Sequence, residues 1–273
     1  MGNLIPMART SINLRVRGGF TIMEVMTVMA AIIVLVGLVA TAAGVARSIS
    51  RGTVCRANLR QLHLAAETYH ISSGAYPAAI LYLVDEGGVR TVSWDFDHRG
   101  DGTIEPGPIW AYLDGPEKVF QCPEFHGSST FGDDPATGYN YNTTYIGAEG
   151  RYPIPQGDRI LQGWDHCRRG VPAGVHRRPA STALFGDGGW RDGANKFMRA
   201  PSNEVEIDLA LVHGGTQAFR HGGCTNVCCL DGHVECRENP FEGVHANGDL
   251  LESISGFPRN GFLSDDDSAY DPR

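Results

Sequence analysis

Three carboxylates in one short segment have the types and spacing of a metal site. Asp95, Asp97 and Asp101 lie in the run DFDHRGDGTIE, which includes glycines suited to a sharp turn. Closely spaced carboxylates around a tight turn are typical of calcium loops. The run departs from the D-x-[DN]-x-[DN]-G spacing by inserted residues, and no Glu stands at the final ligand position. Two interpretations stay open: a loop that binds one Ca²⁺ as a cofactor, or a solvated acidic turn.

His221 and Asp231 have the residue types of a catalytic pair. Asp231-Gly232 separates two short runs typical of strands and predicts a two-residue hairpin turn. In a straight strand the ten residues from His221 to Asp231 would span roughly 33 Å. The chain would have to fold back at Gly222-Gly223 for the two side chains to meet. We therefore expect a turn Asp, a Gly232 with positive φ, and a His that binds a loop.

Seven cysteines indicate an oxidising compartment, and their odd number leaves at least one thiol unpaired. The predicted turn places Cys229 and Cys236 on one face of the hairpin and Cys224 with Cys228 on the other. Cys229 and Cys236 then lie on a diagonal that is long for a disulfide. A zinc site stays open, although the spacing fits no standard Cys-x₂-Cys pair. The histidines that could complete such a site are His221 and His233.

Glu24 is a carboxylate at the edge of a long apolar run. Residues 25–46 carry no charge, and 22 residues span roughly 33 Å as a helix. A bilayer core is about 30 Å thick, so this run is long enough to cross it. A secretory signal peptide is one alternative, but its apolar region normally has about 7–15 residues. A plain anchor is another, but it leaves unexplained a carboxylate that is costly at the membrane edge.

One long helix, from about Phe20 to about Ile71, must position Glu24. No proline interrupts the chain from residue 7 to residue 76, and after Ala46 the pattern becomes amphipathic. Residues 77–273 are punctuated by Gly, Pro, Asn and Asp, which favours short antiparallel strands and long loops. The sequence therefore predicts an α+β fold in which the second half of a long N-terminal helix packs on an antiparallel sheet.

Composition and the absence of certain motifs argue against several classes of function. The formal net charge is −8, and an acidic chain argues against nucleic acid as a partner, because phosphate binding needs clustered Lys and Arg. The strings typical of nucleotide-binding loops, serine hydrolases and zinc proteases do not occur in the sequence. We therefore do not expect an enzyme, although an exported enzyme or ligand-binding domain on a membrane anchor remains the alternative.

The N-terminal motif resembles that of type IV prepilins and type II secretion pseudopilins. The string GFTIME, Gly19 to Glu24, follows a short basic leader and precedes the apolar run. The resemblance implies that a prepilin peptidase removes residues 1–19 by cutting between Gly19 and Phe20, and methylates the amine of Phe20. It also implies that the Glu24 carboxylate pairs with the N-terminal amine of a neighbouring subunit. The motif departs from the usual prepilin pattern at one point, since Ile-Met stands after the Thr where Leu-Ile is usual.

Later segments resemble a large prepilin-like family of planctomycete-type bacteria, whose body domain has no established function. The resemblance covers most of the chain outside residues 78–119 and the last 30 or so. Its most specific part is a His, nine residues and Asp-Gly, which fall here on His221, Asp231 and Gly232. The other segments begin at Cys55, with Asn58 nearby, and include residues 69–70, 74–77, 120–123 and 182–188.

The resemblance implies a structural subunit of a pilus-like or secretion filament, built through the N-terminal helix. Residues 20–46 would cross the inner membrane once, residues 47–76 would continue the helix, and residues 77–273 would form a body in the periplasm. The expected partners are the prepilin peptidase, other pilin or pseudopilin subunits and the inner membrane. The leader is placed in the cytoplasm on this resemblance alone, since arginines lie on both sides of the apolar run.

Overall fold

The computed structural model describes residues 19–86, 88–147, 154–156, 159–161, 176–202, 215–246, 248–252, 256 and 259–273. The chain divides into two compact units, residues 1–46 and residues 47–273, and each is described by itself. Of the predicted leader, residues 1–18 lie outside the described residues. We call the second unit the body.

A single helix, α1, runs from Ile22 to Ser73, within two residues of the prediction. It ends where Gly74 adopts a φ of 76° and its N–H donates to the carbonyl of His70 at 2.8 Å. A positive-φ glycine that binds the last turn in this way is a common end of α-helices, because glycine has no Cβ to strain that conformation.

Within the body, one face of α1 is buried. The buried positions recur every three or four residues, which is the spacing of one helix face, and they are Gly52, Cys55, Asn58, Leu59, Leu62, Ala65, Ala66 and His70. The other side of this half carries exposed residues such as Leu64 and Ile71. The predicted amphipathic continuation after Ala46 is therefore present.

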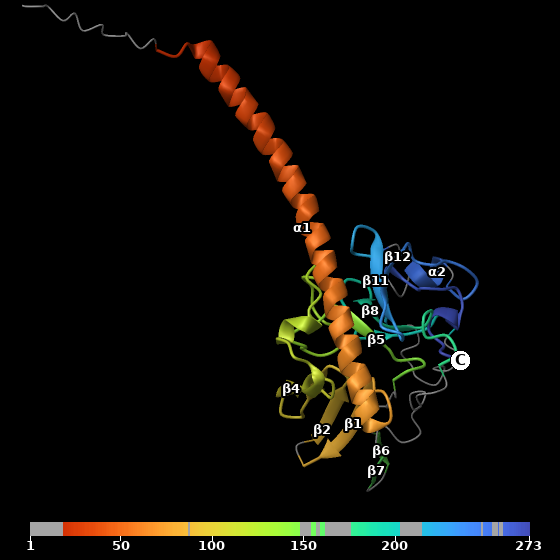
Figure 1. The fold of residues 1–273 in the computed structure, drawn as a ribbon. Coiled ribbons are helices and arrows are strands. Elements are labelled where there is room, and N and C mark those ends of the chain that lie inside the picture. The colour runs from red at the N-terminus through yellow and green to blue at the C-terminus, as the bar shows by residue number, and fades with distance from the viewer. Residues whose placement is uncertain are drawn as a thin grey trace, which may run out of the picture. The chain divides into compact units, whose positions relative to one another are not determined.

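The first sheet is an antiparallel meander of four strands in the order β1-β2-β3-β4. Its strands are β1 (Ile80–Asp85), β2 (Gly88–Ser93), β3 (Phe96–His98) and β4 (Ile104–Pro106). Figure 1 shows these strands beside the end of α1. The core receives Trp94 from the connection between β2 and β3, and Phe96 from β3.

The second sheet has seven strands, in the order β12-β11-β8-β10-β13 with β5 and β9 beside β8. Its strands are β5 (Tyr139–Asn142), β8 (Ala183–Gly189), β9 (Phe197–Met198), β10 (Thr216–Ala218), β11 (Cys224–Cys229), β12 (Val234–Glu238) and β13 (Asn260–Gly261). The pair β5 and β9 is parallel, so this sheet is mixed where the sequence predicted only antiparallel pairing. The α+β class with a long N-terminal helix is confirmed.

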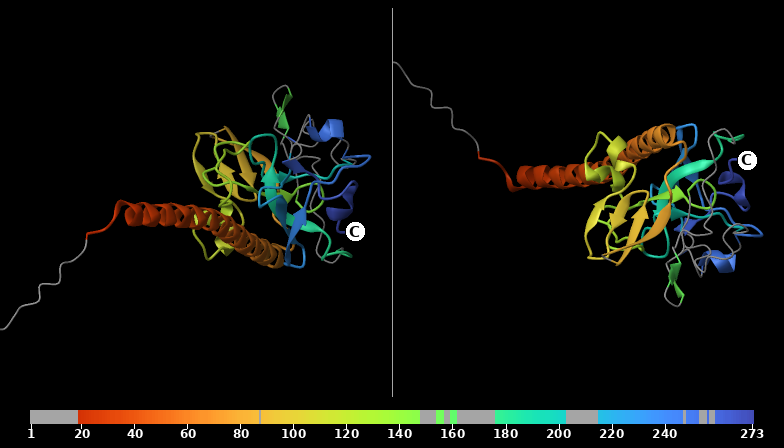
Figure 2. Two further views of the ribbon diagram at one scale, coloured as in Figure 1. Left: turned by 90° about the horizontal axis from the view of Figure 1, so that it is seen from above. Right: turned by 90° about the horizontal axis from the view of Figure 1, so that it is seen from below.

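The remaining elements are short. They are the pair β6 (Ile154–Gln156) and β7 (Arg159–Leu161), the helix α2 (Gly248–Leu250), and the 3₁₀ turns η1 (Trp110–Tyr112), η2 (Glu117–Phe120) and η4 (Asp267–Ala269). The views of Figure 2 show the second half of α1 passing over both the β1–β4 sheet and the strands around β8. The main core lies there: Leu59 and Leu62 of α1 belong to one buried cluster with Trp94, Phe120 and Phe185.

The hairpin of β11 and β12 differs from the prediction by one residue. Cys228 pairs with Val234, the Gly232 N–H donates to the Cys229 carbonyl at 2.9 Å, and the Cys229 N–H donates to the His233 carbonyl at 3.0 Å. Gly232 has the expected positive φ, 87°. These features are typical of a three-residue loop that ends in a bulge at a left-handed glycine. The predicted two-residue turn is therefore wrong.

This shift of one residue changes which cysteines share a face, because side chains alternate along a strand. Cys236 lies opposite Asn226, two positions from the partner of Cys224. Cys224 and Cys236 are therefore on one face, and they form a disulfide with Cα atoms 5.8 Å apart. The predicted register had placed these two cysteines on opposite faces. The disulfide also removes both from the set of possible zinc ligands.

Candidate functional site

Thr21 and Glu24 form a capping box at the start of α1. The Glu24 carboxylate accepts hydrogen bonds from the Thr21 N–H and hydroxyl, both at 2.8 Å. In return the Glu24 N–H donates to the Thr21 hydroxyl at 3.3 Å. This reciprocal pairing satisfies N–H groups that have no partner within the helix. Glu24 therefore has a local structural role that sequence reasoning missed, although the T-x-x-E string was there to be read.

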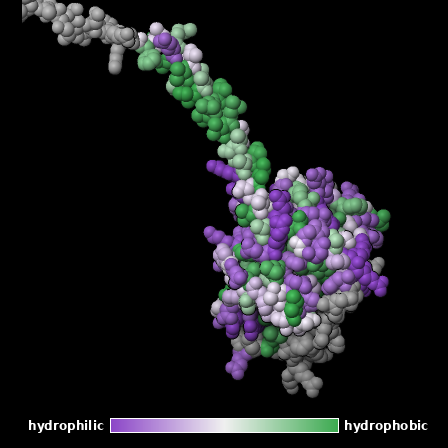
Figure 3. Space-filling view, in the orientation of Figure 1, coloured by the Kyte–Doolittle hydropathy of each residue, from purple (hydrophilic) through white to green (hydrophobic). Residues whose placement is uncertain are grey.

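The segment after Glu24 exposes apolar side chains all round. Met26, Ile33 and Leu38 are each more than 60 % exposed. Figure 3 shows hydrophobic residues gathered along this part of α1, whereas the visible surface of the body is dominated by hydrophilic ones. By length and composition, α1 could cross a membrane. An apolar surface of this extent needs a membrane or other proteins to cover it.

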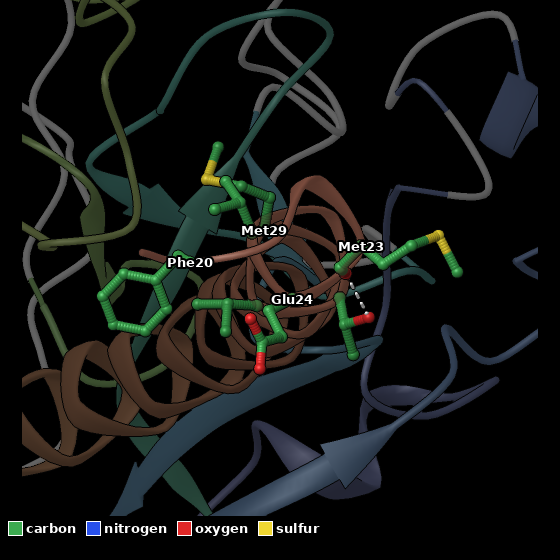
Figure 4. A pocket seen from close by; sticks show the side chains of 7 residues that line it. Phe20, Met23, Glu24 and Met29 are labelled. Atoms are coloured by element: carbon green, nitrogen blue, oxygen red, sulfur yellow. Dashed lines mark hydrogen bonds between the residues drawn. The ribbon is translucent and has the colours of Figure 1, made fainter. Parts of the chain in front are cut away.

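The first residues of α1 surround the Glu24 carboxylate with apolar side chains. Figure 4 shows Phe20, Met23 and Met29 spreading outward around Glu24. The hollow between them is lined only by residues 20–29 of this one segment. With no opposite wall, it has the character of a helix surface rather than of a ligand cavity. Its chemistry is that of a carboxylate at the edge of an apolar contact face.

The three predicted calcium ligands have three different partners. Asp95 accepts a hydrogen bond from the Lys196 ammonium at 2.8 Å, Asp97 pairs with Arg90 in β2, and Asp101 accepts from the Thr103 N–H at 2.9 Å. Groups of three or more potential metal ligands occur elsewhere in the described residues, and neither such group includes an aspartate from this segment. The structure therefore gives the calcium hypothesis no support.

Asp95 instead belongs to a buried ion network. Lys196 donates to both Asp95 and Asp134 at 2.8 Å, and Asp134 also contacts His98 Nε2 at 2.8 Å. Lys196 and Asp134 have side chains only 1 % exposed. Burial raises the pKa of Asp95 to about 6, although the positive charge of Lys196 acts in the opposite direction. The sequence separation of Asp95 and Lys196, 101 residues, hid this pairing from sequence reasoning.

His221 and Asp231 do not meet. Gly222 and Gly223 have φ values of 67° and 94°, which turn the chain back, and His221 and Cys224 exchange backbone hydrogen bonds at 3.0 and 3.3 Å. Asp231 accepts a hydrogen bond from the His233 N–H at 3.1 Å, as a turn aspartate does. The chain does fold back at the two glycines, which was the condition for the pair to meet, but the fold-back brings His221 to a different carboxylate, Asp187.

Four side chains from distant parts of the sequence gather in the body, and we call them the Cys-Asp-His cluster. Its members are Cys55 of α1, Cys122 after η2, Asp187 of β8 and His221 before β11. One potential ligand atom of each lies within 4.8 Å of all the others. Cys55, Cys122 and Asp187 are fully buried, and the His221 side chain is 5 % exposed. Each residue lies in a segment that carries the family resemblance.

The members of the cluster contact one another directly. Cys55 Sγ donates to Asp187 Oδ1 at 3.1 Å, and Cys122 Sγ lies 3.6 Å from His221 Nε2. His221 Nε2 is also 3.3 Å from Asp187 Oδ2. A hydrogen-bond relay from a cysteine through a histidine to an aspartate needs both imidazole nitrogens. Here one nitrogen faces both partners, so this geometry does not favour a catalytic triad.

Burial and the contacts between the groups shift their ionisation in opposite directions. Burial raises the pKa of the Cys55 thiol, whereas hydrogen bonding from Cys55 is the main cause that lowers the pKa of Cys122. For His221, burial lowers the pKa, but hydrogen bonds with Asp187 and Cys122 outweigh burial and raise it. The cluster thus favours negative charge on Cys122 and Asp187, beside the imidazole, and a neutral thiol on Cys55.

The chain matches no protein-family model, no curated protein and no solved structure.

Proposed function

We propose that this chain is a pilin-like structural subunit that is anchored in the inner membrane by the first half of α1 and assembles with other pilin or pseudopilin subunits through that helix. In this proposal a prepilin peptidase removes the leader after Gly19 and methylates Phe20. The body lies in the periplasm. The filament is of the type IV pilus or type II secretion kind.

The observation that carries the proposal is a carboxylate at the head of an uncovered apolar helix. Glu24 has its hydrogen-bond partners in Thr21, while the apolar side chains that follow are exposed. A capping box explains why a carboxylate is favourable at this helix end. It does not explain why the following residues are apolar on every side. A membrane explains that, and a subunit amine beside Glu24 would neutralise the charge there.

The position of the cleavage site distinguishes a pilin-like subunit from a plain membrane anchor and from a secreted protein with a signal peptide. The mature N-terminus, measured by mass spectrometry of the chain taken from native membranes, is expected at N-methylated Phe20. Gly19→Ala is expected to remain largely uncut. An N-terminus at Met1, or one near Ala43 as for a signal peptide, would contradict the proposal. Normal cleavage of Gly19→Ala would contradict the peptidase assignment.

Two substitutions of Glu24 separate its capping role from a role in assembly. Glu24→Gln keeps an oxygen that can accept from the Thr21 N–H but removes the charge, because Gln also serves in capping boxes. If the carboxylate pairs with a subunit amine, Glu24→Gln and Glu24→Ala are both inserted and cut but enter filaments poorly. Filament incorporation is measured by shearing and immunoblotting.

Thr21→Ala is the matched control for capping. It removes the hydroxyl that caps the helix, at a typical cost of about 1 kcal/mol, but leaves the charge of Glu24. We expect its incorporation to stay close to wild type. If Thr21→Ala assembles as poorly as Glu24→Ala while Glu24→Gln assembles normally, Glu24 acts as a cap alone and the assembly role is wrong.

A further inference from the structure

We propose that Cys55, Cys122, Asp187 and His221 bind one Zn²⁺ ion, which fastens the second half of α1 to the second sheet and its loops. The site would be closed and structural, with four protein ligands. Its residues belong to the body alone, so the proposal is independent of whether the chain assembles into a filament.

The four ligand atoms all lie within 4.8 Å of one another, and the separations of three pairs can be compared with a tetrahedral shell. With Zn–S of about 2.3 Å and Zn–N or Zn–O of about 2.0–2.2 Å, tetrahedral angles place ligand atoms about 3.3–3.8 Å apart. His221 Nε2 lies 3.6 Å from Cys122 Sγ and 3.4 Å from Asp187 Oδ1. Cys55 Sγ lies 3.1 Å from Asp187 Oδ1, slightly closer than in such a shell. Metal binding would therefore move Cys55 Sγ and Asp187 Oδ1 slightly apart.

Asn226 donates hydrogen bonds to two of the proposed ligands. Its backbone N–H donates to Asp187 Oδ2 at 2.7 Å and its side-chain amide donates to the same oxygen at 3.2 Å. The same amide donates to Cys55 Sγ at 3.4 Å. These donors leave Asp187 Oδ1 directed at the cluster as a single ligand oxygen. Hydrogen bonds of this kind orient carboxylate and thiolate ligands in metal sites.

A divalent cation would also balance the negative charge that the ligands carry once both thiols are deprotonated by metal binding. Two thiolates and a carboxylate would place three negative charges in a region closed to water, which is costly unless they are paired. A divalent ion offsets two of them. Arg220 precedes His221 in the chain and donates to the carbonyl of Gly188, next to Asp187, so its positive charge lies near the ligands and can balance the third. The remaining ligand, His221, is neutral when it binds a metal.

The ligand types select zinc. Thiolate and imidazole ligands in a four-coordinate arrangement suit Zn²⁺, whereas Ca²⁺ and Mg²⁺ prefer oxygen ligands throughout. The three fully buried ligands and the nearly buried imidazole leave no position for a substrate. A closed shell of four protein ligands is the hallmark of a structural zinc site, whose binding energy stabilises the fold.

The position of the site explains what the ion would do. Cys55 is the ligand from α1, and the other three residues come from the loop after η2, from β8 and from the Gly222-Gly223 turn. The imidazole also packs on the helix, since a Cβ added at Gly52 would lie 3.8 Å from His221 Nδ1. A metal bond at this point links the helix directly to the central strand of the second sheet.

Metal content and cobalt spectra of the full chain, purified in detergent without added chelator, test the proposal. The expected result is about one zinc ion per chain by plasma mass spectrometry. After exchange for Co²⁺, the unsubstituted chain should show the charge-transfer and ligand-field bands of a tetrahedral thiolate site. Cys122→Ser and His221→Ala should lose the zinc, and chelation should lower the melting temperature of the wild type.

Cys229→Ala is the matched control. It removes a buried thiol from the second group of potential ligands, Cys229, His233 and Glu235, and should keep the full metal content. The cobalt spectrum keeps the test decisive even if a ligand variant fails to fold. A wild-type chain with no bound metal, or with a Cys55–Cys122 disulfide in its peptide map, overturns the site. Zinc lost in Cys229→Ala but kept in Cys122→Ser also overturns it, and another metal on the same residues overturns the choice of zinc.

Discussion

Folded proteins usually bury apolar side chains and expose charged ones, and the two units of the chain depart from this in different ways. Residues 20–46 expose apolar side chains such as Val34 and Leu35, both more than 60 % exposed. The body does the opposite and buries charged and polar side chains, among them Asp187 and Lys196, which are at most 1 % exposed. The apolar side chains of residues 20–46 are thus left uncovered, whereas the charged side chains of the body are enclosed by protein.

The difference shows where each unit finds its stabilisation. The buried ions Lys196, Asp95 and Asp134 have one another as partners, so the fold satisfies their charges within the chain. The apolar surface of the first unit has no such cover among the described residues and depends on a membrane or on other subunits. Substitutions in the two units should therefore be detected by different measurements, and each prediction below tests that separation.

The largest effect on the body is expected from Lys196→Met. The substitution keeps an apolar chain of similar length but leaves Asp95 and Asp134 buried without the ammonium that both contact. Breaking a buried pair in this way typically costs about 3–5 kcal/mol. Urea unfolding of the full chain in detergent should show this loss, while membrane retention stays normal.

The control for that experiment is Lys118→Met, because Lys118 is the only other lysine of the chain and is exposed. Its stability should change by less than about 0.5 kcal/mol. Equal stability of Lys196→Met and wild type would show that the body does not depend on this buried charge.

A somewhat smaller loss is expected from Leu62→Ala in the buried face of α1. Leu62 is fully buried in the main core, and truncation of such a leucine typically costs about 2–5 kcal/mol. Leu64→Ala, two residues away, truncates a side chain that is 65 % exposed and should cost less than about 0.5 kcal/mol. Similar unfolding midpoints for the two variants would mean that the helix does not dock through this face.

The smallest of the three effects is expected from Leu35→Arg, and it should fall on the other unit. Leu35 lies near the middle of the apolar run, where an arginine in a membrane-spanning helix costs about 2.5–3.5 kcal/mol. Carbonate extraction should release more of this variant from membranes than of wild type. The urea midpoint of the body should stay the same. A changed midpoint with normal retention would reverse the roles given to the two units.

Local pattern was enough to predict the elements that depend on neighbouring residues. The uncharged run from residue 25 to 46 and the absence of proline predicted one long helix, and α1 follows it to within two residues. The Asp-Gly string predicted a turn and a left-handed Gly232. The α+β class followed from the long helix together with the frequent Gly, Pro, Asn and Asp residues of 77–273, which predicted short strands and loops. These features depend on helix length, side-chain period and the freedom of glycine, all of which act over a few residues.

Only the tertiary structure decided which distant side chains meet. The register of the β11–β12 hairpin shifted by one residue, because its loop has three residues rather than two, and that shift paired Cys224 with Cys236. Lys196 reaches Asp95 across 101 residues, and Cys55 reaches Asp187 across 132. Sequence spacing carries no record of such contacts, since they depend on how two sheets and a helix pack. The sequence therefore determined the helix that could anchor the chain, whereas packing alone created the buried Cys-Asp-His cluster.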